Sequence, residues 1–230
     1  MMSTTDAPLV SDKLDITTLL QKQPEDANYQ DISQRYDCIR RIKGDGNCFY
    51  RALSYGHLES VLDNSKEMQN FKETVMQSRT ELLSAGFDEN TFLDMLKTFV
   101  QVIEKVEADK QGSTLLNLFT DQTTSDTIVR YLRFLTSAYL QNHAEFFQHF
   151  VEAPSLKEYC TQEVEPMAME CDHVEILALS QALGISIKIE YMEGSNSDLT
   201  QHIIPEGTKP SLHLLYKASH YDILYPGKQS

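Results

Sequence analysis

The sequence predicts an α+β domain, because a long helical region is followed by a shorter region of strands. In the middle of the chain, apolar side chains recur every three or four residues, which is the spacing of one face of a helix. After residue 170 the spacing becomes two, which is typical of a half-buried strand. The helical positions are Phe92, Leu96, Phe99, Ile103, Val106, Ile128, Leu132, Leu135 and Tyr139, and the alternating ones are Ile185, Ile187, Ile189 and Tyr191.

Helix ends can be placed from their capping residues. Ser78 and Glu81 have the spacing of a capping box, and Gly86 can end the helix that follows. Asp88 is expected to cap the helix that carries Phe92, and a longer helix should start near Ser125.

The later part of the chain predicts one more helix and then strands. Asp172 and Glu175 have capping-box spacing, and Gly184 should end the helix HVEILALSQAL. The segment EGSNSD reads as a turn after the first strand, and SLHLLYK and HYDILYP read as two further strands. Short loops between these strands favour antiparallel pairing, with the helices packed around the sheet.

Length and charge restrict the classes of function. The chain has 230 residues, enough for one substantial core, so we expect a mobile tail over residues 1–12 and a single domain over residues 13–230. The formal net charge of −14 disfavours nucleic acid and anionic membranes as partners and favours a basic protein surface or peptide.

The four cysteines form no regular framework, which is typical of a reducing compartment. The N-terminus lacks the pattern of a secretory signal, and no segment approaches the roughly 20 apolar residues that cross a bilayer. We therefore expect a cytoplasmic or nuclear protein.

The stretch KGDGNCFYRAL places Cys48 where a glycine-rich turn meets a helix. Gly44 and Gly46 allow a sharp turn with exposed amides, and the partial positive charge of a helix N-terminus favours a thiolate. The same amides could bind an oxyanion. A buried, inert cysteine after a turn fits this stretch equally well.

A reactive thiolate needs an imidazole, and His220 is the best of the seven histidines. In SHYDILYP, His220 and Asp222 are two positions apart on a strand, so both side chains project from one face. A carboxylate beside the ring can fix its tautomer and stabilise the imidazolium. By itself, a His-x-Asp pair is more often part of an exposed strand face. It becomes evidence for a catalytic site in combination with Cys48.

Two other clusters have weaker signals. Cys160, Cys171, Asp172 and His173 are all metal-ligating types, but they lack C-x-x-C spacing and no neighbour completes a tetrahedral set. The acidic side chains at 163, 165 and 170 could meet a basic substrate, but a solvated loop is the favoured interpretation. We expect no metal.

KGDGNCFYRAL resembles the nucleophile motif of the ovarian-tumour-type cysteine proteases, and SHYDILY resembles their closing strand with the catalytic histidine. FTDQTTSD, YLRFLTSAYL, EVEPMAMECDH and LHLLYK follow in the order of the otubain branch, so the resemblance runs from about Leu14 to Tyr225. It implies a papain-like fold, with a small, mostly antiparallel sheet packed between helical lobes. It further implies a deubiquitinase without metal or organic cofactor.

The resemblance assigns roles to four residues. Cys48 is the implied nucleophile, His220 the general base and Asp222 the third member of the triad. Asp45 matches a motif aspartate whose backbone region helps to form the oxyanion hole with the Cys48 amide. The chain is most similar to the short form of the family, which lacks a long N-terminal extension and often carries asparagine at the position of Asp222. Either residue can orient the histidine.

The implied reaction is hydrolysis, through a thioester, of isopeptide bonds at the C-terminus of ubiquitin in conjugates or polyubiquitin chains. Expected partners are ubiquitin, polyubiquitin and ubiquitin-conjugating enzymes, and the protein is expected to be a monomer. An alternative is a regulator that binds ubiquitin or ubiquitin-conjugating enzymes without catalysis. The short segment before the domain and the intact Cys48, His220 and Asp222 favour catalysis. A thiol esterase or transferase with the same triad is a third alternative, which the chain-long resemblance disfavours.

Overall fold

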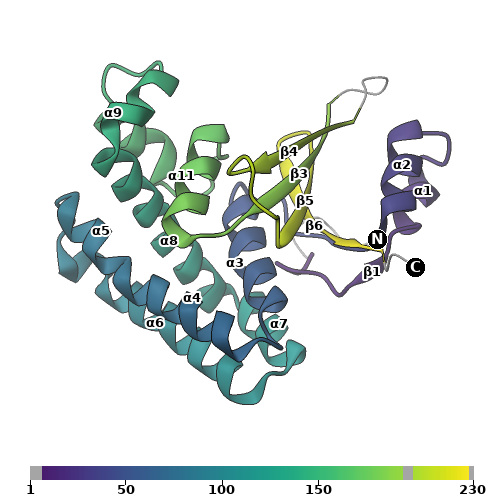
Figure 1. Cartoon of the computed structure of the whole chain (residues 1–230), viewed down its shortest axis with the longest axis horizontal. Coiled ribbons are helices and arrows are strands. Elements are labelled where there is room, and N and C mark those ends of the chain that lie inside the picture. Colours follow the sequence, from purple (N-terminus) through teal and green to yellow (C-terminus); the bar gives the residue numbers. More distant parts are fainter. Residues whose placement is uncertain (1–6, 194–198, 228–230) are drawn as a thin grey trace.

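The computed structural model describes residues 7–193 and 199–227. Helix α3 (Cys48–Ser60) lies between a six-stranded sheet and a lobe of helices (Figure 1). The lobe comprises α4 (Ser65–Gln77), α5 (Arg79–Ser84), α6 (Glu89–Asp109), α7 (Gly112–Thr120), α8 (Gln122–Asn142) and α11 (His173–Leu183). Shorter turns of helix extend α8: α9 (Ala144–Phe147), η2 (Gln148–Phe150), α10 (Leu156–Tyr159) and η3 (Cys160–Val164).

The sheet has the order β1-β2-β6-β5-β3-β4. Its strands are β1 (Leu14–Asp15), β2 (Tyr36–Arg40), β3 (Ile187–Met192), β4 (Thr200–Ile204), β5 (Leu212–Lys217) and β6 (His220–Pro226). Every pairing is antiparallel except that of β3 with β5. A mostly antiparallel sheet in an α+β fold was expected. Strands β1, β2 and β4 were not predicted, and the turn expected over EGSNSD lies largely outside the described residues.

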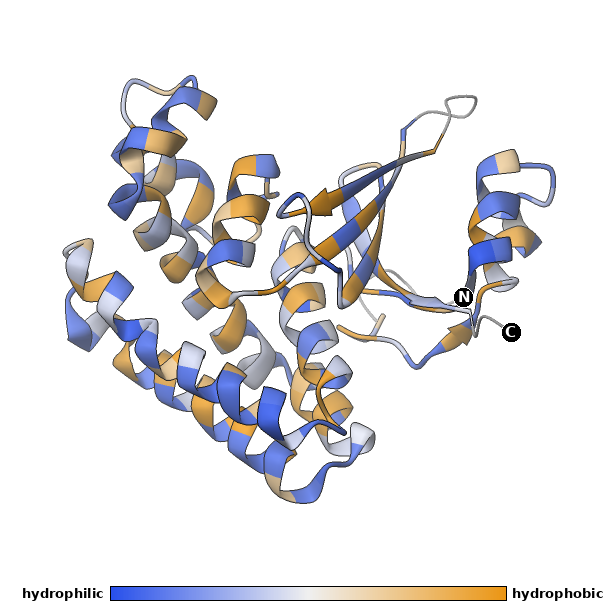
Figure 2. Ribbon diagram, viewed as in Figure 1, coloured by the Kyte–Doolittle hydropathy of each residue, from blue (hydrophilic) through white to orange (hydrophobic). Residues whose placement is uncertain are grey.

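The helical lobe follows the apolar spacing of the sequence. All five predicted core positions of α6 are buried, and so are Ile128, Leu132 and Leu135 on α8. These side chains join α3 and the inner face of the sheet in one continuous core. Figure 2 shows hydrophilic and hydrophobic residues interleaved along these helices, as amphipathic packing requires.

Most predicted caps are present. The Asp88 side chain accepts a hydrogen bond at the start of α6, and Asp172 and Glu175 form a capping box on α11. The capping box at Ser78 is wrong, because the Ser78 hydroxyl bonds the Val75 carbonyl and the Tyr131 hydroxyl instead. Helix α8 is capped by Asp121, a few residues before the expected start.

The outer face of the sheet is covered by α1 (Thr18–Lys22) and α2 (Ala27–Arg35), which pack a second apolar cluster against it. The carboxylate of Glu190 on β3 is fully buried there, bonded to the Arg35 guanidinium and to the Tyr36 hydroxyl. The expectation of a half-buried strand is therefore wrong for β3, because both of its faces are covered.

The N-terminal segment also differs from expectation. Leu9 and Val10 are buried, Val10 bridges Ile42, and the Lys43 amide donates to the Leu9 carbonyl. The mobile tail predicted for residues 1–12 is therefore wrong for this part, which packs beside the turn that precedes Cys48. Residues 1–6 lie outside the described residues. Within the described ranges, no helix is long and apolar enough to span a bilayer.

Candidate active site

Helix α3 begins at Cys48, as the sequence predicts, and the Cys48 side chain is nearly buried at 5% exposure. Gly46 before it has a φ of +84°, and a Cβ there would lie 2.1 Å from the carbonyl oxygen of Ala168. A Cβ on Gly44 would lie 3.3 Å from Nδ1 of His220. The two glycines therefore let the turn approach the Ala168 backbone on one side and the imidazole on the other.

The Asp45 carboxylate stabilises this turn through hydrogen bonds. Its Oδ1 accepts from the Asn47 amide at 2.9 Å, and its Oδ2 lies 3.1 Å from Nη2 of the buried Arg51. The Asp45 amide donates to the Lys43 carbonyl at 3.0 Å. Among the described residues, no hydrogen bond occupies the amides of Gly46 and Cys48, so those two can receive an oxyanion.

His220 is the first residue of β6 and follows a tight turn in which Ala218 and Ser219 have φ values of 51° and 64°. Its Nε2 lies 2.8 Å from Oδ1 of Asp222, so both side chains share one face as expected. Its Nδ1 faces Gly44, in the turn before Cys48, and the imidazole lies close enough to the Cys48 side chain for that group to affect its pKa. The structure thus brings Cys48, His220 and Asp222 together.

These contacts set the charge of the imidazole. Burial alone would lower the pKa of His220, but the hydrogen bonds and negative charges of Asp222 and Cys48 outweigh burial and raise that pKa to about 10. At neutral pH the imidazole therefore carries a proton on both ring nitrogens.

Asp222 is held from two further directions. It is 4% exposed, and its Oδ1 also accepts from the Ile42 amide at 2.8 Å. Its Oδ2 lies 3.3 Å from Nε of Arg41, which is half-exposed. The carboxylate oxygen that faces His220 is therefore fixed by backbone, while Arg41 balances the other oxygen.

The predicted alternative cluster has no catalytic geometry. Cys160 is buried, and burial raises the pKa of its thiol to about 12. Burial likewise raises the pKa of Cys171, and Asp172 is occupied in capping α11. No group of three or more metal-ligating side chains forms within the residues that the structure describes.

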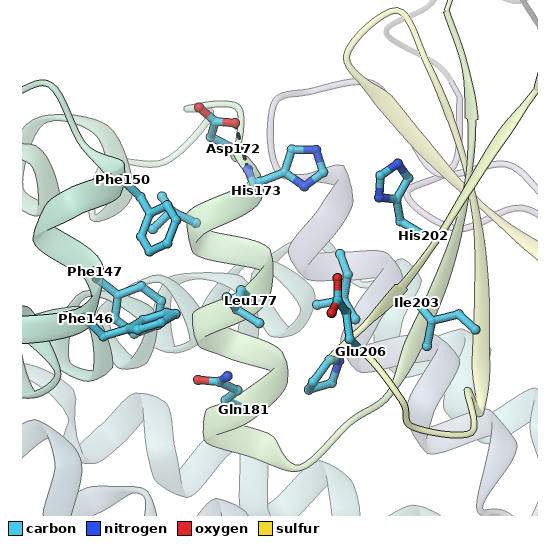
Figure 3. A pocket seen from close by; sticks show the side chains of 13 residues that line it. Phe146, Phe147, Phe150, Asp172, His173, Leu177, Gln181, His202, Ile203 and Glu206 are labelled. Carbon is cyan, nitrogen blue, oxygen red and sulfur yellow. Dashed lines mark hydrogen bonds between the residues drawn. The ribbon is translucent and has the colours of Figure 1, made fainter.

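A groove of about 560 Å³ around α11 was not predicted from the sequence (Figure 3). Helix α11 lies between its walls, with three phenylalanines on one side and His202 of β4 on the other. Phe146 and Phe150 are 52% and 61% exposed. Tilted ring contacts join His173 of the groove to Tyr191, Tyr216 and Tyr221, and Tyr221 lies on the strand of His220. The segment FFQHF was the signal in the sequence that could have indicated this groove. Three phenylalanines close together at the end of a helix form more apolar surface than packing in the core requires.

A thiol at a helix N-terminus, an imidazole beside it and a carboxylate bonded to the imidazole form the arrangement of a cysteine-dependent hydrolase. The chain matches the family described as Peptidase C65 Otubain over residues 2–226. It therefore belongs to the otubain family.

Similar proteins include the ubiquitin thioesterase OTUB2 of Mus musculus, which is 50% identical over 99% of this chain and 100% of the relative. The ubiquitin thioesterase OTUB1 of Homo sapiens is 49% identical over 95% of this chain and 83% of the relative. A chain in the solved complex of ceOTUB1 with ubiquitin aldehyde and UBC13~Ub superposes with a TM-score of 0.92 at 28% identity, covering 98% of this chain and 96% of that one.

Proposed function

We propose that this protein is a deubiquitinating cysteine protease that hydrolyses isopeptide bonds at the C-terminus of ubiquitin. The observation that carries the proposal is the His220 imidazole, which is hydrogen-bonded to Asp222 and lies beside the Cys48 side chain at the start of α3. The ubiquitin specificity is supported by relatives named ubiquitin thioesterases that match nearly the whole chain.

The first half of the reaction forms a thioester. The Cys48 thiolate adds to the carbonyl carbon of the last ubiquitin residue, and the resulting oxyanion is placed to accept hydrogen bonds from the free amides of Gly46 and Cys48. The imidazolium of His220 gives its proton to the leaving amine as the C–N bond breaks. The products of this step are the amine and a ubiquitin thioester on Cys48.

The second half releases ubiquitin. Neutral His220 takes a proton from water, whose oxygen attacks the thioester and expels the Cys48 thiolate. Throughout the reaction, the Asp222 carboxylate accepts a hydrogen bond from the Nε2–H group of His220. This hydrogen bond keeps Nδ1 of the imidazole directed toward Cys48. Asp45 contributes by stabilising the turn before Cys48. Its carboxylate accepts a hydrogen bond from the Asn47 amide, and its own amide donates to the Lys43 carbonyl.

The apolar groove is the proposed docking surface for the body of ubiquitin. Phe146 and Phe150 are both more than half exposed and their ring centroids lie 5.2 Å apart, so they form a continuous apolar patch rather than scattered single side chains. A series of ring contacts connects His173 of this groove to Tyr221, the residue after His220. The similar ceOTUB1 chain was solved with ubiquitin aldehyde, which supports ubiquitin as the occupant.

The direct test is cleavage of a ubiquitin C-terminal fluorogenic amide and of ubiquitin dimers by the wild type and by Cys48→Ala. The wild type should cleave both, and Cys48→Ala should have no detectable activity while still binding ubiquitin. Hydrolysis by Cys48→Ala would require a different nucleophile.

The groove has its own test in Phe150→Ala. We expect KM to rise about tenfold with kcat nearly unchanged, because the lost contact serves ground-state and transition-state binding equally. Met76→Ala is the matched control, since Met76 on α4 is 52% exposed but lies outside this groove. Equal effects of the two substitutions would contradict docking in the groove.

A second function is binding of ubiquitin-conjugating enzymes, which is supported by the presence of UBC13~Ub in the similar ceOTUB1 complex. Such regulation would not need the thiol. Inhibition of ubiquitin transfer by Cys48→Ala as strong as that by the wild type would establish the non-catalytic role.

A further inference from the structure

Arg133 on α8 is a fully buried arginine without a carboxylate partner. Within the described residues no acidic side chain lies within ion-pair distance of it, and its Nε has no hydrogen-bond partner. Burial lowers the pKa of Arg133, although arginine keeps its proton in proteins. Removing such a charge from water carries a large desolvation penalty. The groups that Arg133 binds should therefore explain why an arginine occupies this buried position.

The guanidinium joins two segments that are far apart in the sequence. Nη2 lies 3.0 Å from the Gly46 carbonyl and 2.7 Å from Oδ1 of Asn47, in the turn before Cys48. Nη2 also lies 2.9 Å from the Met169 carbonyl, and Nη1 lies 3.1 Å from the Val164 carbonyl. Arg133 thus bonds the nucleophile turn and residues 164–169 at the same time.

The two segments also contact each other directly. Oδ1 of Asn47 accepts a second hydrogen bond, from the Ala168 amide at 2.8 Å. Ala168 has a φ of 67°, and its carbonyl approaches Gly46 so closely that no Cβ would fit there. Arg133 therefore lies beneath a tight backbone contact, while the Tyr50 ring covers its Cζ at 4.4 Å.

These contacts fix the peptide plane between Gly46 and Asn47, one peptide before that of the nucleophile. The Gly46 carbonyl points to Arg133, and the Asn47 amide of the same planar peptide points the opposite way, to Oδ1 of Asp45. Both ends of this peptide are hydrogen-bonded, whereas no hydrogen bond among the described residues occupies the amide of the following Cys48.

We propose that Arg133 is a positioning residue, which holds the Gly46–Asn47 peptide so that the thiol and the amide of Cys48 are aligned for attack. This inference rests on the proposed hydrolysis and extends it to a residue that touches neither substrate nor thiol. Displacement of a reacting group by about 1 Å can cost about 100-fold in rate, so loss of the guanidinium should reduce turnover rather than binding.

The test compares Arg133→Met and Arg133→Lys with Leu132→Ala, a neighbouring buried substitution on α8 whose apolar side chain makes no hydrogen bond to either segment. For both Arg133 variants we expect kcat on a ubiquitin C-terminal amide to fall about 100-fold while KM changes less than about threefold. Leu132→Ala should lower Tm by a comparable amount yet keep kcat within about threefold of the wild type. A kcat loss in Arg133→Met no larger than that in Leu132→Ala, or a loss confined to KM, would overturn the proposal.

A second readout does not depend on ubiquitin. The rate at which iodoacetamide alkylates Cys48, followed on the Cys48 peptide by mass spectrometry, should fall in the Arg133 variants and not in Leu132→Ala. If the wild type failed to cleave ubiquitin substrates, the proposed function would fail while this comparison still decided the role of Arg133. Should Arg133→Met not fold, Asn47→Ala serves instead and should lower both rates about tenfold, because it removes the side chain shared by Arg133 and Ala168. Wild-type rates in a folded Asn47→Ala would overturn the proposal.

Discussion

The two halves of the active site are built in opposite ways. The histidine half is a regular hairpin, in which a strand periodicity of two places His220 beside Asp222 and one backbone amide fixes the carboxylate. The nucleophile half is an irregular turn held by buried polar groups, with Arg51 of α3 on one side and Arg133 of the distant helix α8 on the other. The comparison teaches that the hairpin orients its side chains through local geometry, whereas the turn depends on tertiary contacts.

The largest effect is expected in the hairpin half, at Asp222. Asp222→Ala should lower kcat by about 1000-fold, because His220 loses the acceptor that fixes its Nε2 proton. Asp222→Asn should cost only about tenfold, because its carbonyl oxygen can still accept from His220 and Ile42 while Arg41 turns toward solvent. Steady-state kinetics on a ubiquitin amide measure both. Equal losses would indicate that the charge of Asp222, and not its orientation, is what matters.

The tightest contact of the nucleophile half, between Gly46 and the Ala168 carbonyl, can be disrupted by a substitution. Gly46→Ala should destabilise the fold by about 3 kcal/mol, because the new Cβ meets backbone and cannot relax as a flexible side chain would. Urea denaturation measures the loss. Gly86→Ala is the matched control, since Gly86 also has a positive φ but nothing lies near its Cβ position. If both variants lost the same stability, the Ala168 contact would contribute nothing beyond the left-handed conformation.

The raised pKa of His220 predicts how stability depends on pH. A histidine whose folded-state pKa lies near 10 stabilises the fold fully below its ordinary value of about 6.5, and this contribution disappears as pH rises through 10. The difference in unfolding free energy between the wild type and His220→Gln should therefore be greatest near pH 6 and should shrink toward pH 10. A difference that stayed constant over this range would show that the imidazole is not held by anionic neighbours.

The smallest effect should come from relaxing the hairpin turn. Ser219 has a left-handed backbone conformation that glycine adopts without strain, so Ser219→Gly should stabilise the protein by about 0.5 kcal/mol. The midpoint of urea denaturation measures this gain. A loss of stability would mean that the Ser219 side chain makes a favourable contribution that outweighs its backbone strain.

The sequence predicts those parts of the fold that depend on local spacing. The apolar spacing of α6 and α8, the helix that starts at Cys48, and the shared face of His220 and Asp222 are all confirmed in the structure. The otubain resemblance is confirmed by the family match. The expected cytoplasmic or nuclear location and the monomeric state stay predictions.

The features that could not be predicted depend on residues far apart in the chain. Glu190 is buried because Arg35 and Tyr36 bond it from a segment more than 150 residues away, which the alternation of β3 does not reveal. The parallel pairing of β3 with β5 follows from the insertion of β4 between them along the chain. Arg133 reads as a polar position of a helix, and nothing in its neighbourhood indicates that four oxygen atoms from two distant segments surround it.

The most direct test of the account is reaction with ubiquitin that carries an electrophile at its C-terminus, followed by intact mass. The account predicts one ubiquitin adduct on the wild type and none on Cys48→Ala, because Cys48 is the nucleophile aimed at the ubiquitin tail. Alkylation by iodoacetamide should confirm that Cys48 is a free thiol in the same preparation. A wild-type protein with a free thiol and no adduct, or an adduct that persists in Cys48→Ala, would contradict the account.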